Sequence, residues 1–251
     1  MSKSKPHTMA DTWFLMGSPA PILCIVASYL YFVLKLGPKL MASRKPLNMK
    51  PFLLAYNFSI AVLSLYVAVM IAAGGLVSHL IVEGCNPKQR SSEHTYKVHL
   101  CSWWYLMSKV VELTDTVVFV LRKKERQVSF LHVYHHASQV LFTWAYLKYL
   151  PGEQGIVVGF INSAIHVVMY FYYMVAAMGP KYQKYLWWKK YMTWIQLGQF
   201  VLILGYLIFT LASDCHLPRQ LSILFSINTC ILLGLFTNFY LQTYKKRKEL
   251  D

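Results

Sequence analysis

Five long segments without charged residues constrain this chain more than any other feature of its sequence. An α-helix needs about 20 apolar residues to cross the ~30 Å hydrocarbon core of a bilayer. The chain is 56% hydrophobic and only 14% charged, which is unusual for a soluble domain. We therefore predict an all-α membrane protein, organised as one transmembrane domain over residues 1–251. The five segments are residues 13–34, 52–73, 154–178, 191–213 and 220–244.

Two further segments, residues 98–121 and 127–147, are long enough to cross a bilayer but carry polar side chains. We count both as spans, which predicts seven transmembrane helices. A β-barrel is the other structure that crosses membranes, but its strands alternate in polarity, whereas these segments are continuously apolar between their polar residues. The polar residues of the two segments are Lys109, Glu112, Asp115, His132, His135 and His136.

The basic residues predict an orientation. With seven spans, most of the 25 Lys and Arg residues fall in loops on one side, and such loops are usually cytosolic. This places the N-terminus in the lumen and the C-terminus in the cytosol, with the first span a retained anchor rather than a cleaved signal peptide. These basic loops form a belt on one side of the membrane, which accounts for most of the net charge of +15. Such a belt attracts anionic lipid headgroups, so we expect no nucleic-acid partner. The belt could also hold the phosphates of an anionic substrate.

Two of the five cysteines, Cys85 and Cys215, fall in loops on the non-cytosolic side, where disulfides can form. Cys101 competes as a partner, and the alternative that all five are reduced stays open, because spacing does not reveal geometry.

Three histidines follow one another at helical spacing in the segment His132 to His136. Positions i, i+3 and i+4 share one helix face, so the three imidazoles are predicted to face one cavity. The alternative is a set of hydrogen-bonded core histidines without a chemical role. Ionisable side chains in a membrane are costly and usually functional, which favours a reaction or transport site.

A second polar face precedes the histidines. Lys109, Glu112, Asp115 and Thr116 recur at three- and four-residue spacing, so they form a stripe that can face the histidine helix. A carboxylate that accepts a hydrogen bond from an imidazole would fix the tautomer of that ring. The alternative for Lys109 and Glu112 is an internal ion pair that only neutralises buried charge.

Later segments add more polar residues at helical spacing. A role in packing is the alternative to a role in the site for Tyr172, and interhelical hydrogen bonding is the alternative for Gln196 and Gln199. The residues are Asn162, His166, Met169, Tyr170 and Tyr173 in one segment and Thr193, Gln196 and Gln199 in the next.

The histidines could bind a metal or act as nucleophiles. Three or four imidazoles suffice for a zinc ion, so a zinc site stays open as an alternative. A neutral imidazole can also attack a thioester and pass the acyl group onward. We favour covalent catalysis and assign no metal ligands.

Four sequence motifs resemble the signature motifs of the very-long-chain fatty acid elongases: KVVELTDT from Lys109, HVYHH from His132, HVVMYFYY from His166 and TWIQLGQ from Thr193. The resemblance implies a very-long-chain 3-oxoacyl-CoA synthase of the endoplasmic reticulum membrane. Such an enzyme condenses a long-chain acyl-CoA with malonyl-CoA to 3-ketoacyl-CoA, CO₂ and CoA, with no cofactor beyond its substrates. It also implies that six of the seven helices form a barrel around a substrate tunnel, and that Cys85 and Cys215 form a lumenal disulfide.

The resemblance assigns roles by position. His135 is the acyl-accepting nucleophile, His136 and His166 serve decarboxylation and proton transfer, and Asp115 orients an imidazole; His132 and Glu112 complete the expected catalytic group. The expected substrate-binding residues are Lys109, Asn162, Tyr170, Tyr172, Tyr173, Gln196 and Gln199 in the chamber, and Arg122, Lys123, Lys124, Lys189 and Lys190 at the cytosolic mouth, where they would bind the CoA phosphates.

Two other functions compete with condensation: a histidine-lined metal or proton transporter, and an acyl-CoA-binding scaffold without turnover. The sequence leaves open the acyl chain length, the division of roles among the histidines, homo-oligomerisation, and direct binding of the ketoacyl reductase, dehydratase and enoyl reductase of the elongation cycle.

Overall fold

The structure is a computed structural model that describes residues 9–74, 92–149, 154–213 and 219–245. Every regular element in these residues is a helix. The elements are η1 (Met9–Thr12), α1 (Pro19–Tyr31), η2 (Phe32–Leu36), α2 (Gly37–Met41), α3 (Lys50–Ala73), α5 (Ser92–Glu112), α6 (Thr114–Leu121), η4 (Glu125–Gln127), α7 (Phe130–Tyr149), α8 (Gln154–Met178), α9 (Pro180–Gln183), η5 (Lys184–Leu186), α10 (Lys189–Ala212), α11 (Arg219–Tyr240) and η6 (Leu241–Lys245).

Five helical segments of the described chain are long and apolar enough to cross a membrane, which confirms the five apolar segments predicted from sequence. Apolar side chains such as Phe58, Leu202 and Phe209 are exposed on them, as expected for helices that face lipid. The protein is therefore a multi-pass membrane protein. The five segments are Pro19–Met41, Lys50–Ala73, Gly155–Met178, Lys189–Ala212 and Arg219–Tyr244.

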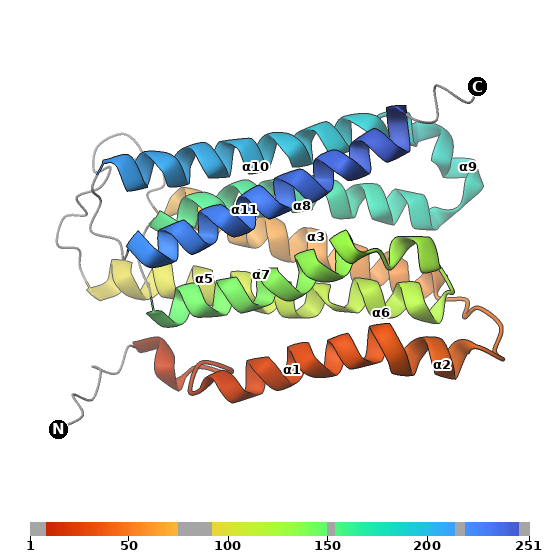
Figure 1. Ribbon diagram of the computed structural model, residues 1–251, viewed down its shortest axis with the longest axis horizontal. Helices are drawn as coiled ribbons and strands as arrows, with labels where there is room; N and C mark the ends of the chain where they lie inside the picture. The colour runs from red at the N-terminus through yellow and green to blue at the C-terminus, as the bar shows by residue number, and fades with distance from the viewer. Residues whose placement is uncertain (1–8, 75–91, 150–153, 214–218, 246–251) are drawn as a thin grey trace.

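The two polar segments are also helical. The first forms α5 and α6, which are separated only by Leu113 in a helical backbone conformation, and the second forms α7. Both run alongside the apolar helices (Figure 1). Their charged and histidine side chains lower their hydropathy, so composition alone does not distinguish them from buried helices of a soluble protein.

The first span begins and ends later than the sequence predicted, at Pro19 and Met41 rather than at residues 13 and 34. Two features explain the shift. Leu15 has a positive φ of 68°, which interrupts the chain before the helix, and Pro19 then occupies the first helical turn, where a missing N–H costs nothing. At the other end, Pro38 follows the π-helical segment η2, whose wider turn accommodates a residue that cannot donate a backbone hydrogen bond.

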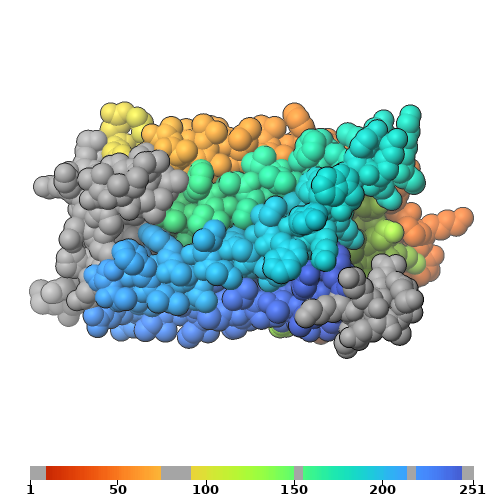
Figure 2. All heavy atoms as spheres, turned by 90° about the horizontal axis from the view of Figure 1, so that it is seen from above, coloured from red at the N-terminus to blue at the C-terminus, as the bar shows by residue number. Residues whose placement is uncertain are grey.

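Six of the helices contact one another in a closed order. Helix α3 contacts α8, α8 contacts α10, α10 contacts α11, α11 contacts α7, α7 contacts α5, and α5 contacts α3. Figure 2 shows one side of this arrangement, where α3, α8, α10 and α11 lie next to one another. The α1–η2–α2 segment packs outside, against α6 and α7, and lies at one edge of the bundle in Figure 1.

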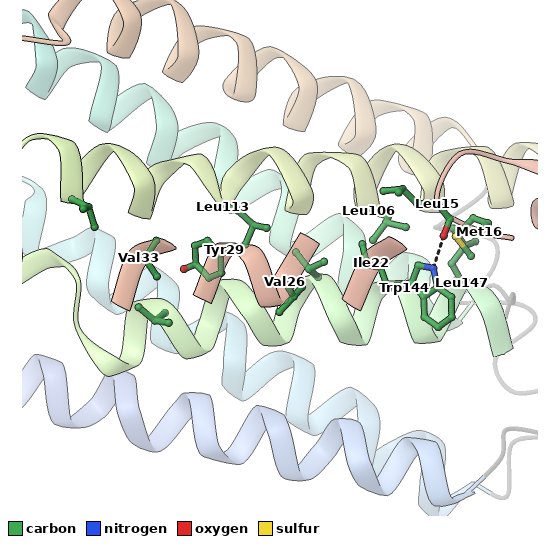
Figure 3. Packing of buried hydrophobic residues seen from close by; sticks show 13 residues of the cluster. Leu15, Met16, Ile22, Val26, Tyr29, Val33, Leu106, Leu113, Trp144 and Leu147 are labelled. Carbon is green, nitrogen blue, oxygen red and sulfur yellow. Dashed lines mark hydrogen bonds between the residues drawn. The ribbon is translucent and has the colours of Figure 1, made fainter. Parts of the chain in front are cut away.

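The outer segment is held by a buried apolar cluster. Ile22, Val26 and Val33 of this segment pack with Leu106 of α5 and Trp144 of α7 (Figure 3). The indole N–H of Trp144 donates a 2.8 Å hydrogen bond to the backbone oxygen of Leu15, which ties the N-terminal turn to α7 (Figure 3). Lipid tails are as apolar as these side chains, so close packing and such hydrogen bonds stabilise this interface in a membrane.

Candidate active site

A buried ionic cluster connects α5 to α8. Lys109 Nζ lies 2.8 and 3.0 Å from the two carboxylate oxygens of Glu112, and Glu112 Oε1 lies 3.2 Å from Nδ1 of His166. The three residues are at most 3% exposed. The ion pair that the sequence suggested as an alternative is therefore present, and it also contacts an imidazole. A pair of opposite charges at this depth is tolerated because each charge has a partner.

Asn162 holds the His166 ring from the side opposite Glu112. The side-chain nitrogen of Asn162, which can only donate, lies 3.3 Å from Nε2 of His166. At the other nitrogen, Nδ1 lies 3.2 Å from Glu112 Oε1, which can accept a proton, and 3.2 Å from Lys109 Nζ, which can only donate. Asn162 also accepts a 2.9 Å hydrogen bond from the Tyr105 hydroxyl and donates to Gln199 Oε1 at 3.3 Å. The amide thereby links α5, α8 and α10.

Asp115 contacts a tyrosine rather than an imidazole. Its carboxylate accepts a 2.6 Å hydrogen bond from the buried Tyr170 hydroxyl, and the ring of Tyr56 on α3 packs edge-on against Tyr170 at 6.2 Å. The imidazole contact that we assigned to Asp115 is made by Glu112 instead. Asp115 lies one turn after Glu112 along α5 and α6, and Tyr170 lies one turn after His166 along α8. Glu112 therefore contacts His166, and Asp115 contacts Tyr170.

The three histidines of α7 lie together, as their spacing predicted. The ring centres of His132 and His136 are 4.3 Å apart, and those of His135 and His136 are 5.3 Å apart. Phe119 packs against His132 and Phe236 packs against His135, at 5.1 and 5.9 Å. Of the three, His136 is buried and His132 and His135 are partly exposed, and the group is bounded by α6, α7 and α11.

The histidine group lies close to the ionic cluster. Helix α7, which carries the three histidines, packs against α5, which carries Lys109 and Glu112. The Nε2 atom of His132 is buried without a hydrogen-bond partner, and no described residue hydrogen-bonds to the ring of His135. Unpaired imidazole nitrogens beside a buried ion pair are suited to attack or proton transfer, because no protein partner competes for the lone pair.

A cavity begins next to this site. All six helices of the closed order line it, through residues that include Ile71 of α3, Tyr105 of α5, Gln139 of α7, Asn162 of α8, Phe200 of α10 and Asn228 of α11. Its volume, taken as the space open to the centre of a water-sized sphere, is about 130 Å³. One water molecule needs roughly 10–15 Å³ on that measure, so the cavity is too large to be a packing defect. Asn162 joins the cavity to the ionic cluster, since it belongs to both.

The remaining predicted residues lie at the margins of the site. Gln196 donates to the sulfur of Met169 at 3.3 Å, and Tyr172 packs edge-on against Trp188, as its packing alternative predicted. Tyr173 is partly exposed and packs against Tyr170.

The predicted CoA-binding residues differ in their surroundings. The Lys123 ammonium donates to the backbone oxygen of Ala42 at 3.1 Å, so it also holds the loop after α2. Lys124, Lys189 and Lys190 are exposed, and Arg122 is partly exposed. The loop after α6 and the start of α10 lie at the same end of the bundle (Figure 1).

Two predictions concern cysteines and metals. Cys85 and Cys215 lie outside the described residues, and Cys101, their possible competitor, is a buried free thiol. Within the part of the chain that the structure describes, no three His, Cys, Asp or Glu side chains are grouped so that they could hold a metal ion.

Sequence reasoning missed three aromatic residues of the site. Tyr105 hydrogen-bonds to Asn162 and places its ring 4.9 Å from Lys109 Nζ, while Tyr56 and Phe236 pack against Tyr170 and His135. Of the three, only Tyr105 could have been predicted from the sequence, because it precedes Lys109 by four residues and so lies on the same helix face.

The site is thus a set of buried histidines and carboxylates inside a bundle of membrane helices, next to a cavity. The family model described as "ELO: GNS1/SUR4 family" matches residues 14–251, and the chain belongs to this family. This confirms the elongase family suggested by the four motifs.

Relatives named as elongases cover most of the chain. It is 42% identical to very long chain fatty acid elongase 1 of Mus musculus over 240 residues, which are 94% of this chain and 85% of the relative. It is 42% identical to elongase 7 of Rattus norvegicus over 244 residues, 96% of this chain and 86% of the relative. It is 40% identical to elongase 4 of Homo sapiens over 239 residues, 95% of this chain and 76% of the relative. These relatives do not favour the transporter alternative.

Proposed function

We propose that this protein is a very-long-chain fatty acid elongase that condenses a long-chain acyl-CoA with malonyl-CoA to 3-ketoacyl-CoA, CO₂ and CoA. Membership of the GNS1/SUR4 family and the names of its relatives support this reaction. The observation that carries it is the gathering of three histidines on α7, which contacts the helix of the Lys109 and Glu112 pair, beside a cavity lined by six helices.

In the first step, an unprotonated ring nitrogen of His135 attacks the thioester carbon of the acyl-CoA. A C–N bond forms, the C–S bond breaks, and the proton on the other ring nitrogen passes to the departing CoA sulfur. The unpaired ring of His135 supports this role, because its lone pair is free for attack. Phe236, packed against the His135 ring, limits the access of water to the acyl-imidazole.

In the second step, malonyl-CoA loses CO₂ and its carbanion attacks the acyl carbon. The electrons of the broken C–C bond remain on the α-carbon, a new C–C bond forms, and the C–N bond to His135 breaks as the leaving ring nitrogen takes up a proton from solvent. His166 and His136 are assigned the proton movements of this step. The His166 ring is held between Glu112 at Nδ1 and Asn162 at Nε2, which fixes its orientation, a positioning role for both side chains.

The substrate path follows from the arrangement of the helices. The six helices in closed contact form a barrel, α1 lies outside it, and the acyl chain occupies the cavity that the six helices line, as the start of a tunnel. Helices α5–α6 and α7 cross the membrane with the five apolar segments, which gives seven spans in one domain. The protein resides in the endoplasmic reticulum with its N-terminus in the lumen and its C-terminus in the cytosol.

The basic residues at the cytosolic end bind the CoA phosphates. Lys189 and Lys190 at the start of α10 and Lys124 after α6 are exposed, so their ammonium groups can reach a soluble ligand. The 3-ketoacyl product then passes to the reductase, dehydratase and second reductase of the elongation cycle.

Product analysis tests the proposal. Membranes that contain the wild-type protein and labelled malonyl-CoA should release labelled CO₂ and form a 3-ketoacyl-CoA two carbons longer than the acyl-CoA supplied. His135→Ala should abolish both, while Gln220→Ala, an exposed substitution on α11, should not. A wild-type protein that binds acyl-CoA without releasing CO₂ would favour the scaffold alternative, and bound zinc with histidine-dependent ion flux would favour the transporter.

A further inference from the structure

A polar stripe continues along α7 beyond the histidines. Gln139 follows His135 by four residues, and Thr143 follows Gln139 by four, so all three share one helix face. Both Gln139 and Thr143 line the cavity. Neither side chain forms a hydrogen bond anywhere in the described part of the chain. The cavity wall therefore offers unpaired hydrogen-bonding groups next to the site.

Several other polar residues of the same wall are already paired. The hydroxyls of Ser102, Thr210 and Thr229 donate to backbone oxygens of their own helices at 2.8–2.9 Å. Asn162 uses both ends of its amide in the active site. The hydroxyls of Ser222 and Tyr206 also line the cavity without a hydrogen bond to a described residue, so Gln139 and Thr143 are distinguished by their place on the α7 face that carries His135.

The neighbouring helix α11 adds one more donor. The side-chain oxygen of Asn228 on α11 accepts a 2.9 Å hydrogen bond from the Tyr134 hydroxyl of α7, while its amide nitrogen has no hydrogen-bond acceptor among the described residues. Asn228 lines the cavity as well. Donors and acceptors from α7 and α11 thus border the cavity.

A saturated chain fits such a wall poorly. Methylene groups exclude water from the amide and hydroxyl but offer them no hydrogen bond, and unpaired buried polar groups are costly. A chain that carries an oxygen atom at the right depth restores these bonds. A site built to hydrogen-bond a substrate hydroxyl discriminates strongly against the analogue that lacks it.

We propose that this tunnel selects acyl-CoA chains that carry a hydroxyl group, bound by Gln139 and Thr143. The inference rests on the proposed function, and it names the substrate class of the same site. Gln139 and Thr143 lie about 6 and 12 Å beyond His135 along the helix axis, at 1.5 Å per residue. The hydroxyl therefore lies in the middle part of the chain rather than next to the thioester.

The test compares two acyl-CoAs of equal length, one saturated and one with a single mid-chain hydroxyl. The ratio of their kcat/KM values is measured for the wild type, for Gln139→Leu and for Thr143→Val. The wild type should prefer the hydroxylated chain, and each substitution should lower the ratio by about tenfold, since a lost hydrogen bond of this kind has that size. Gln220→Leu, the same type of change at an exposed position of α11, should leave the ratio unchanged.

The outcomes separate this inference from the proposed function. A wild type that elongates the saturated chain at least as well, with a ratio unaffected by Gln139→Leu and Thr143→Val, would overturn the selectivity while the condensing activity stands. A wild type that condenses neither substrate would overturn both. Using a ratio within each variant removes the effect of a smaller folded fraction, and Thr143→Val provides the answer if Gln139→Leu does not fold.

Discussion

The Tyr170 hydroxyl on α8 donates a 2.6 Å hydrogen bond to the carboxylate of Asp115 on α6, and both side chains are buried. This bond lies one turn beyond the contact between Glu112 and His166 on the same two helices. With the bond between Tyr105 and Asn162 on the other side, the two helices share three successive polar contacts. Each contact fixes the register of α5 and α6 against α8, so the position of His166 depends on all three.

Removal of the Tyr170 hydroxyl should destabilise the protein. In Tyr170→Phe the buried carboxylate of Asp115 loses its 2.6 Å donor and keeps the Tyr56 hydroxyl as a partner, so the cost should lie near the lower end of the range of about 1–3 kcal/mol for an unsatisfied buried group. The free energy of unfolding in mixed detergent micelles measures the loss. Tyr31→Phe on the exposed face of α1 is the matched control and should change little. Equal stability of the two variants would contradict a structural role for this bond.

Lys109→Met should destabilise the protein more. It leaves Glu112 as a buried charge without its cation, which typically costs about 3–5 kcal/mol. The double variant Lys109→Met/Glu112→Leu removes both charges and should recover much of the stability but not the condensation, because His166 then lacks its orienting carboxylate. A Lys109→Met protein as stable as the wild type would show that the ion pair is not formed.

The outer helix should be coupled to the bundle through one hydrogen bond. The hydroxyls of Tyr29 on α1 and Thr116 on α6 lie 2.8 Å apart in a buried position. A double-mutant cycle with Tyr29→Phe and Thr116→Val should give a coupling of about 0.6 kcal/mol, the usual size for interhelical hydrogen bonds in membranes. Strictly additive effects on unfolding in micelles would mean that the two hydroxyls do not interact.

The KM for acyl-CoA should rise with ionic strength, because exposed ammonium groups attract the CoA phosphates through a screened interaction. Lys189→Gln/Lys190→Gln should raise the KM at low salt and make it less sensitive to salt, with kcat nearly unchanged. Lys97→Gln, which removes a lysine paired with Glu93 near the start of α5, is the control and should leave the salt dependence as in the wild type. A double variant with the salt response of the wild type would exclude these two lysines from CoA binding.

The sequence predicted those parts of the structure that depend on one helix at a time. Continuous apolar length identified the five membrane-crossing segments, and helical spacing placed His132, His135 and His136 on one face. The ends of the first span were wrong because they depend on the backbone at Leu15 and Pro38 rather than on hydropathy.

Contacts between helices were harder to predict. Spacing placed Glu112 and Asp115 on one stripe but not their depth relative to α8, so the imidazole contact went to the neighbouring carboxylate. Tyr56 and Phe236 could not be found at all, because each lies on a separate helix among many aromatic residues and carries no distinguishing pattern.

The most direct test of the account is the mass of the protein after incubation with acyl-CoA in the absence of malonyl-CoA. The account predicts that one acyl group is added, that the modified peptide contains His135, and that the adduct disappears when malonyl-CoA is supplied. His135→Ala should gain no acyl group. An acyl group on another residue that is still passed to malonyl-CoA, or rapid condensation without any acylated protein, would contradict the assignment of His135 as the nucleophile.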